Sequence, residues 1–225
     1  MEYYLIYFIL PLVITLWAQT SVKNAYAKYS RIASERGYTG YDTARRILDA
    51  NGLYSVKIER IPGQMTDHYD PKANVVRLSE GVYSSCSIAA CGIAAHEVGH
   101  ALQYAKQYAP IKLRMAVIKS ANIGSKLAMP RFIIGLFLSL PGLCYAGIIA
   151  FSAAVLFQII TLPVEFNASR RAVEAIEKFR PSETELNGVK KMLSAAAMTY
   201  VASLAVSLLS LLRLISIAQG SNRRR

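Results

Sequence analysis

The chain has 225 residues, of which 53% are hydrophobic and 18% are charged, and long uncharged runs interrupt it. These runs exclude a wholly soluble protein, whose apolar residues would recur at periods of two or 3.6 between charges. The formal net charge is +12, but no zinc-finger spacing, RNA-binding aromatic motif or dense basic helix accompanies it, so nucleic acid is not an expected partner.

The first apolar run predicts a membrane anchor over residues 1–19. Glu2 precedes the run, and Lys23, Lys28 and Arg31 follow it. A cleavable signal peptide would carry its positive charge before the run, so a retained anchor is expected. Lys and Arg placed beside apolar runs also fit anionic lipid headgroups, which makes the lipid bilayer an expected partner.

Residues 20–130 predict a water-facing catalytic region. Capping residues and breakers indicate helices over 23–35, over 43–50 with Asp42 as its cap, and over 87–107 with Pro110 closing it. Strand-like pieces cover 54–61 and 74–78, on either side of a polar loop. The stretch from Ile111 to Met129 alternates basic and apolar residues, which favours an amphipathic helix at the membrane interface.

The remainder predicts a membrane hairpin and a final apolar segment. The 33 residues from Phe132 to Val164 carry no charge and are interrupted at Pro141-Gly142, which indicates a two-armed hairpin over 131–164. We expect a charged helix over 165–191, which Glu165 opens, and a membrane segment with a basic tail over 192–225.

Three cysteines, Cys86, Cys91 and Cys144, are odd in number, so they cannot form a complete disulfide framework. The separation of Cys86 from Cys91 is not that of a zinc knuckle or ribbon. We expect buried thiols in a reducing compartment.

The string from Ala94 to Leu102 carries the chemistry, because it contains His96, Glu97 and His100 in the pattern His-Glu-x-x-His. Residues four apart share one face of a helix, so the two imidazoles can bind one zinc ion. The carboxylate between them can take a proton from a water at the metal and return it to a leaving amine. Two surface histidines would have charged neighbours, whereas these have Ala, Val and Gly.

The third metal ligand is less well determined by the residues themselves. Catalytic zinc has three protein ligands and a water, and the candidates are His68 and several carboxylates. Glu165 follows a long apolar run, where an unligated carboxylate would be costly. The helix dipole would also favour a carboxylate at a helix start, so Glu174 and Glu177 stay open as alternatives.

Three strings resemble membrane neutral zinc metallopeptidases of the YugP type, which are similar in layout to the HtpX-like membrane proteases. These strings run from Thr66 to Pro71, from Ala94 to Gln103, and from Leu162 to Phe166. The resemblance implies that Glu165 is the third zinc ligand. It also implies a mainly α, multi-pass membrane protein with a gluzincin-like zincin helical core and a small β element. Asn167 stands where the family is expected to have Asp, which leaves a supporting role for that position open.

His68 is a second catalytic candidate, beside Glu97. Its loop precedes the strand-like Asn74 to Leu78, which could pair with an extended substrate peptide. His68 or Tyr69 could then donate a hydrogen bond to the tetrahedral oxyanion. A loop histidine held by a neighbouring aspartate is an equally open interpretation.

The sequence thus predicts a zinc metallopeptidase of the bacterial inner membrane that cleaves peptide bonds in membrane proteins. Positive charges after the first apolar run place the active site in the cytoplasm, although the basic tail argues against a single crossing by the last segment. Two alternatives remain: a proteolytically inactive membrane scaffold with a structural zinc site, and a binding module that meets anionic lipid or nucleic acid through its basic surface.

Overall fold

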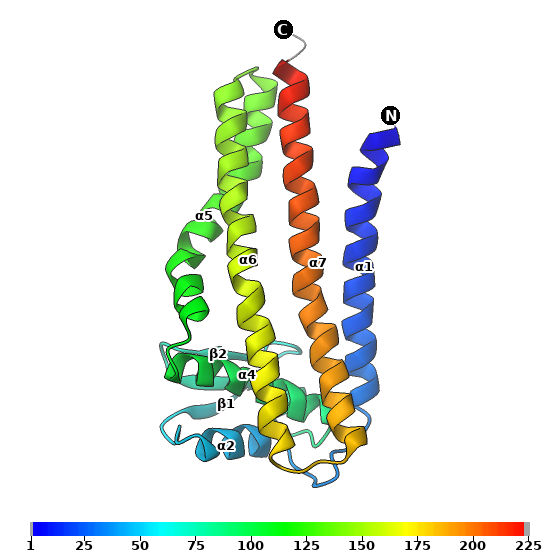
Figure 1. Ribbon diagram of the computed structural model, residues 1–225, viewed down its shortest axis with the longest axis vertical. Coiled ribbons are helices and arrows are strands. Elements are labelled where there is room, and N and C mark those ends of the chain that lie inside the picture. The colour runs from blue at the N-terminus through cyan, green and yellow to red at the C-terminus, as the bar shows by residue number, and fades with distance from the viewer. Residues whose placement is uncertain (1, 223–225) are drawn as a thin grey trace. The chain divides into compact units, whose positions relative to one another are not determined.

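The computed structural model describes residues 2–222, and side chains from residue 6 to residue 220. The fold is mainly helical with a small sheet, as predicted (Figure 1). The described elements in chain order are α1 (Glu2–Tyr29), α2 (Gly40–Ala50), β1 (Lys57–Ile61), β2 (His68–Asp70), β3 (Val75–Ser79), α3 (Glu80–Tyr83), α4 (Ile88–Ala105), α5 (Ala109–Phe137), α6 (Pro141–Glu177) and α7 (Glu183–Asn222). The predicted basic tail, Arg223 to Arg225, lies outside the described residues.

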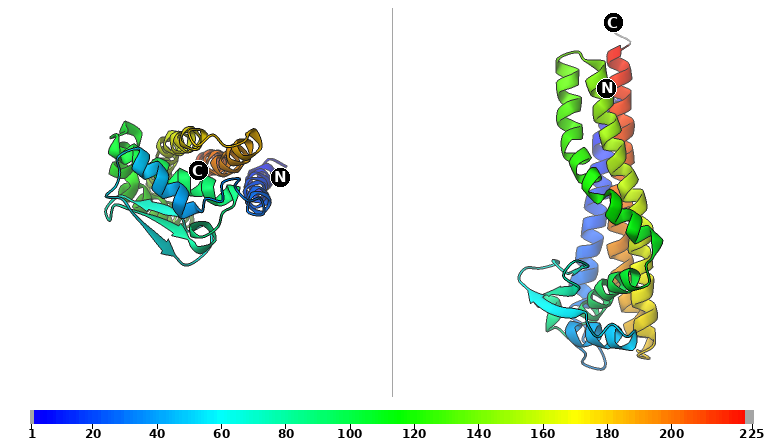
Figure 2. Two further views of the ribbon diagram at one scale, coloured as in Figure 1. Left: turned by 90° about the horizontal axis from the view of Figure 1, so that it is seen from below. Right: turned by 90° about the vertical axis from the view of Figure 1, so that its left-hand side faces the viewer.

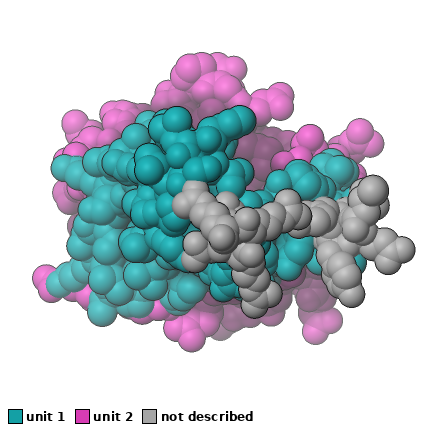
Figure 3. All heavy atoms as spheres, turned by 90° about the horizontal axis from the view of Figure 1, so that it is seen from above, with its two compact units in different colours: residues 1–18, 109–163, 199–225 teal, residues 19–108, 164–198 magenta. Residues whose placement is uncertain are grey.

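The chain divides into two compact units, which Figure 3 shows in different colours. Unit 1 contains residues 1–18, 109–163 and 199–225, and unit 2 contains residues 19–108 and 164–198. Helices α1, α6 and α7 each contribute one part of their length to each unit.

Three of the described helices are long and apolar enough to cross a membrane: Ile6–Tyr29, Pro141–Glu177 and Glu183–Gly220. They contain most of the first apolar run, the second arm of the predicted hairpin and the final apolar segment. Large apolar side chains on their unit 1 portions are exposed, including those of Leu12 and Ile149. Such exposure would be costly in water and is expected where side chains face lipid.

The predicted hairpin is present in unit 1, and glycines allow its two arms to approach closely. Helix α5 ends at Phe137 and α6 begins at Pro141, so the turn falls at the predicted interruption. A Cβ on Gly135 would lie 2.7 Å from the Cys144 backbone nitrogen, and one on Gly147 would lie 2.8 Å from the Ala128 oxygen. Small residues of this kind are typical of packed membrane helices.

Helix α5 differs from the prediction, because it is one element from Ala109 to Phe137 with Pro130 inside it. The separate interfacial helix predicted from Ile111 to Met129 is therefore wrong. Pro110 lies in the first turn of α5, where its missing N–H costs no hydrogen bond. Pro110 therefore follows the end of α4 and also belongs to the start of α5.

Unit 2 contains a three-stranded sheet in the order β1-β3-β2. Strand β1 runs parallel to β3, and β2 runs antiparallel to it. Strand β2 lies in the segment predicted to be only a loop. Because both sides of β3 are paired, the predicted pairing of Asn74 to Leu78 with a substrate peptide is wrong, and the edge strands of the described sheet are β1 and β2. Figure 2 shows the small sheet in two further views.

The helix ends in unit 2 follow from local capping. Helix α2 starts about one turn earlier than predicted, because Thr39 is its N-cap. The Thr39 side chain accepts a hydrogen bond from the Asp42 N–H, and the Asp42 carboxylate accepts one from the Thr39 N–H, which together form a capping box. The Thr39 hydrogen bonds lower the pKa of Asp42, outweighing the opposing effect of its burial. Helix α4 matches its prediction, with Ser87 accepting a hydrogen bond from the Ala90 N–H.

Helix α4 lies in the core of unit 2, where α2, α3 and the sheet pack on it. Ala94, Ala95, Val98 and Ala101 are at most 1% exposed. Small side chains on this helix let neighbouring elements come close without voids. The chemistry-bearing residues of α4 are therefore held on a rigid element.

The unit 2 part of α6 packs directly on α4 at Gly99. A Cβ on Gly99 would lie 2.6 Å from the Ala168 carbonyl oxygen and 3.2 Å from its Cα. Helix α6 runs unbroken from Pro141 to Glu177, so the prediction that Glu165 opens a helix is wrong. Glu165 is instead held in mid-helix, three residues before Ala168.

This contact predicts opposite effects of two alanine substitutions on α4. Gly99→Ala should lower the free energy of unfolding by roughly 1–3 kcal/mol, because backbone atoms of α6 would have to move. Gly92→Ala is the matched control, since its Cβ would meet Val189 Cγ1 at an ordinary 3.6 Å. That variant should gain about 0.5–1 kcal/mol from the helix preference of alanine. Thermal unfolding in detergent measures both, and equal stability of the two variants would contradict the close contact.

Candidate metal centre

His96 and His100 are one turn apart on α4 and share a face of that helix. Their ring centroids are 4.8 Å apart, with the ring planes at 86° to each other. Each side chain keeps a small exposed fraction, 16% for His96 and 13% for His100. The pair is therefore held by the helix and is still reachable from outside.

Glu165 of α6 completes a group of three with these histidines. Its side chain is 2% exposed, and its Oε2 lies 3.3 Å from His96 Nε2 and 3.6 Å from His100 Nε2. One possible ligand atom from each residue lies within 4.8 Å of the other two. Sequence reasoning named these three residues, and the structure brings them together from two helices.

The distances from Glu165 to the two histidines suit zinc. Zinc bonds of about 2.0–2.1 Å in a tetrahedron put neighbouring ligand atoms about 3.3 Å apart. The two Glu165 distances, 3.3 and 3.6 Å, lie near that value. Two imidazoles with one carboxylate are also a ligand set that catalytic zinc uses.

The other ring nitrogens are held by neighbouring side chains. His96 Nδ1 lies 3.2 Å from Ser169 Oγ, and His100 Nδ1 lies 3.0 Å from Gln103 Oε1. Both Nε2 atoms are thereby directed toward Glu165. Partners of this kind orient metal-binding histidines in general.

Gln103 and Ser169 were missed by sequence reasoning, although spacing gave a signal for both. Gln103 stands three residues after His100, and Ser169 stands four after Glu165, so each shares the face of its ligand. Asn167, whose role the sequence left open, accepts hydrogen bonds from Gln103 Nε2 at 3.0 Å and from Arg171 Nε at 2.7 Å.

Glu97 is buried next to the pair, with 8% exposure. Burial lowers the pKa of His100, but its pairing with the Glu165 carboxylate and the charge of Glu97 outweigh it, so that the pKa lies above the ordinary value. The Glu97 carboxylate is thus close enough to His100 to act on its charge.

The other candidates lie apart from this group. His68 is on β2, exposed to solvent, with its Nδ1 2.8 Å from the Thr66 oxygen. Glu174 pairs with Arg170 at 3.6 Å and Glu177 with Lys190 at 3.1 Å. The structure therefore does not bring His68, Glu174 or Glu177 into the group formed by the described residues His96, His100 and Glu165.

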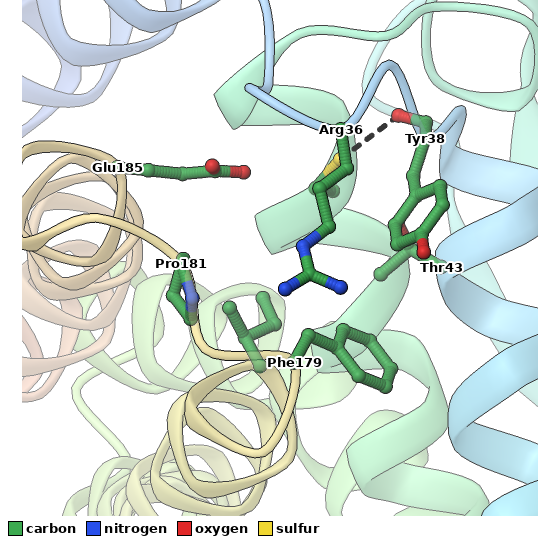
Figure 4. Close-up of a pocket in the computed structure, with 8 residues that line it drawn as sticks. Arg36, Tyr38, Thr43, Phe179, Pro181 and Glu185 are labelled. Atoms are coloured by element: carbon green, nitrogen blue, oxygen red, sulfur yellow. Dashed lines mark hydrogen bonds between the residues drawn. The ribbon is translucent and has the colours of Figure 1, made fainter.

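The described cysteines are free thiols, with Cys91 and Cys144 buried and Cys86 half-buried. Burial raises the pKa of Cys91, whose thiol donates a hydrogen bond to the Tyr38 oxygen. Cys91 faces a small pocket in unit 2 that Arg36 and Glu185 also line (Figure 4). None of the three metal-centre residues lines it, so it is a separate feature.

Comparison with known proteins agrees with the geometry. Residues 4–219 match the model of a family described as "Putative neutral zinc metallopeptidase". The chain is 52% identical over 206 residues to the "Putative membrane protease YugP" of Bacillus subtilis (strain 168), covering 91% of each chain. No solved structure matches the chain.

The raised pKa of His100 predicts a pH dependence of zinc binding. A proton and a metal ion compete for His100 Nε2. Because the pKa of His100 is raised, the proton begins to compete with zinc at a higher pH than it would at an ordinary histidine. The apparent dissociation constant for zinc should therefore rise by tenfold or more between about pH 8 and about pH 6. Chelator competition on the detergent-purified protein measures it. If the zinc affinity does not change between these pH values, ligation through the His100 imidazole is contradicted.

Proposed function

The chain belongs to the family of neutral zinc metallopeptidases, and we propose from this premise that it is a zinc endopeptidase that cleaves membrane proteins. One observation carries the proposal: the metal-facing atoms of His96, His100 and Glu165 lie within 4.8 Å of one another. The three apolar helices support action at a membrane.

In the proposed mechanism His96, His100 and Glu165 hold the zinc ion. Zinc supplies a Lewis acid that polarises the scissile carbonyl and acidifies a water. Glu97 accepts a proton from the attacking water and later returns it to the leaving amine. Its burial beside the histidines supports this role, since proton transfer needs a carboxylate within hydrogen-bonding reach of the water.

We also propose a gluzincin-like core, in which one helix supplies both histidines and a second supplies the glutamate. Helix α4 carries His96 and His100, and helix α6 carries Glu165. The enzyme would act at the bacterial inner membrane, with its site on the cytoplasmic side. Lys23, Lys28 and Arg31 after the first apolar segment support that side. Its proposed partners are protein or peptide substrates and the lipid bilayer.

The rival function, an inactive scaffold with structural zinc, has less support. Structural zinc takes four protein ligands, whereas catalytic zinc takes three and leaves a position for water. Among the residues that the structure describes, the metal-binding group has three members. A ligand set of three favours catalysis.

The first test compares Glu97→Gln with the wild type. The substitution keeps the shape of the side chain and removes the base, so we expect zinc content to be unchanged and cleavage to fall by about 10²–10⁴-fold. Cleavage of casein and of a detergent-solubilised membrane protein measures activity, and metal analysis measures zinc. Wild-type cleavage by this variant would rule out the proposed base.

The second test concerns His68, which we propose donates a hydrogen bond to the oxyanion. Its strand lies against α4, since Tyr69 packs on Tyr104 with ring centroids 5.5 Å apart. Because successive side chains leave opposite faces of a strand, the His68 imidazole is on the exposed face and has to turn toward a bound substrate to donate this hydrogen bond. His68→Ala should lower kcat by about 10²-fold with little change in zinc affinity. A control is Lys57→Ala on the opposite edge strand, which should leave kcat unchanged. An unchanged kcat for His68→Ala would show that the imidazole is only a surface group.

A further inference from the structure

We propose that Gln103 is the residue that positions the metal centre, because one amide fixes His100 on α4 and the chain beside Glu165 on α6. This inference rests on the proposed function, in which those two residues hold zinc. It concerns how the site is prepared for metal before any substrate binds.

The orientation of the Gln103 amide follows from its partners. Nε2 donates to the Val164 carbonyl oxygen at 2.7 Å and to Asn167 Oδ1 at 3.0 Å. Because an amide NH₂ has two donors and a carbonyl oxygen has none, these two acceptors determine which end of the amide faces them. Oε1 is therefore the atom that faces His100 Nδ1 at 3.0 Å.

This orientation selects the form of the imidazole. An acceptor at Nδ1 requires that Nδ1 carry the proton, and a neutral ring then has its lone pair on Nε2. Nε2 is the atom that lies 3.6 Å from Glu165 Oε2. Gln103 thus leaves the correct nitrogen free for the metal.

The same amide also fixes the second helix. Val164 immediately precedes Glu165, so the hydrogen bond to its carbonyl oxygen holds the α6 backbone beside the carboxylate ligand. Gln103 is 0% exposed, so water cannot replace a lost partner without opening the core. A buried amide that has lost its partners is destabilising, which makes the arrangement specific.

Asn167 connects the Gln103 hydrogen bonds to Arg171. Its Oδ1 accepts from Gln103 Nε2 and from Arg171 Nε at 2.7 Å, and the Arg171 guanidinium also lies over the Tyr108 ring. Two donors to one oxygen need an acceptor and not specifically an amide. Asn167→Asp should therefore preserve the arrangement, whereas Asn167→Leu removes the acceptor.

Zinc affinity of the full-length protein in detergent, measured by chelator competition, tests the proposal. Gln103→Met keeps the side-chain length and removes all three hydrogen bonds, and it should weaken zinc binding by about 10–100-fold. The matched control is Gln158→Met in unit 1, where the amide donates to Ser207 Oγ at 2.9 Å; its zinc affinity should equal that of the wild type. Equal affinities for Gln103→Met and wild type, or equal losses in both Met variants, would overturn the proposal.

Two further measurements do not depend on the folding of Gln103→Met. Nitrogen-15 NMR of the metal-free wild type, recorded at a pH high enough that the His100 ring is neutral, should show its single ring proton at Nδ1. A proton at Nε2 would overturn the proposal. Asn167→Leu should bind zinc less tightly than Asn167→Asp, and equal affinities would also overturn it. If the wild type itself binds no zinc, the proposed function is wrong. The NMR measurement of the His100 ring proton still tests whether Gln103 orients that imidazole.

Discussion

The contact between the α4 backbone and the α6 backbone at Gly99 is the constraint on which the metal centre depends. A side chain at this position would meet Ala168, so the two helices lie as close as backbone atoms permit. The histidines flank this glycine on α4, and Glu165 precedes the contact by less than one turn on α6. Close packing therefore converts two helices from distant parts of the sequence into one set of ligands.

Burial explains why this set favours a cation. Glu165 is almost fully buried, and an isolated carboxylate in such a place is costly. Two imidazoles beside it reduce that cost, and a divalent ion would reduce it further. The side chains around the ligands, Ser169 and Gln103, hold the far ring nitrogens and leave the near ones toward the centre.

Sequence reasoning succeeded where the signal was local. The histidine spacing and the Ser87 cap lie within one helix, so periodicity was enough to place them. Glu165 was separated from Glu174 and Glu177 only by family resemblance, because the choice depends on which carboxylate reaches α4. Gln103 was missed for the same reason, since two of its three partners lie on a helix more than sixty residues away.

The errors in the predicted fold concerned where helices and strands begin and end. The charge at Glu165 suggested the start of a helix, but α6 passes through it because the two imidazoles of α4 lie beside the buried carboxylate and offset the cost of its charge. Strand β2 was hidden in a polar loop because its three residues pair with β3 and bury little on their own. In each case a tertiary contact overruled the local pattern.

Zinc X-ray absorption on the purified wild-type protein would identify the atoms that bind the metal. The account predicts a first shell of nitrogen and oxygen at about 2.0–2.1 Å with scattering from two imidazole rings. A sulfur shell at about 2.3 Å, or a spectrum without two imidazoles, would contradict it.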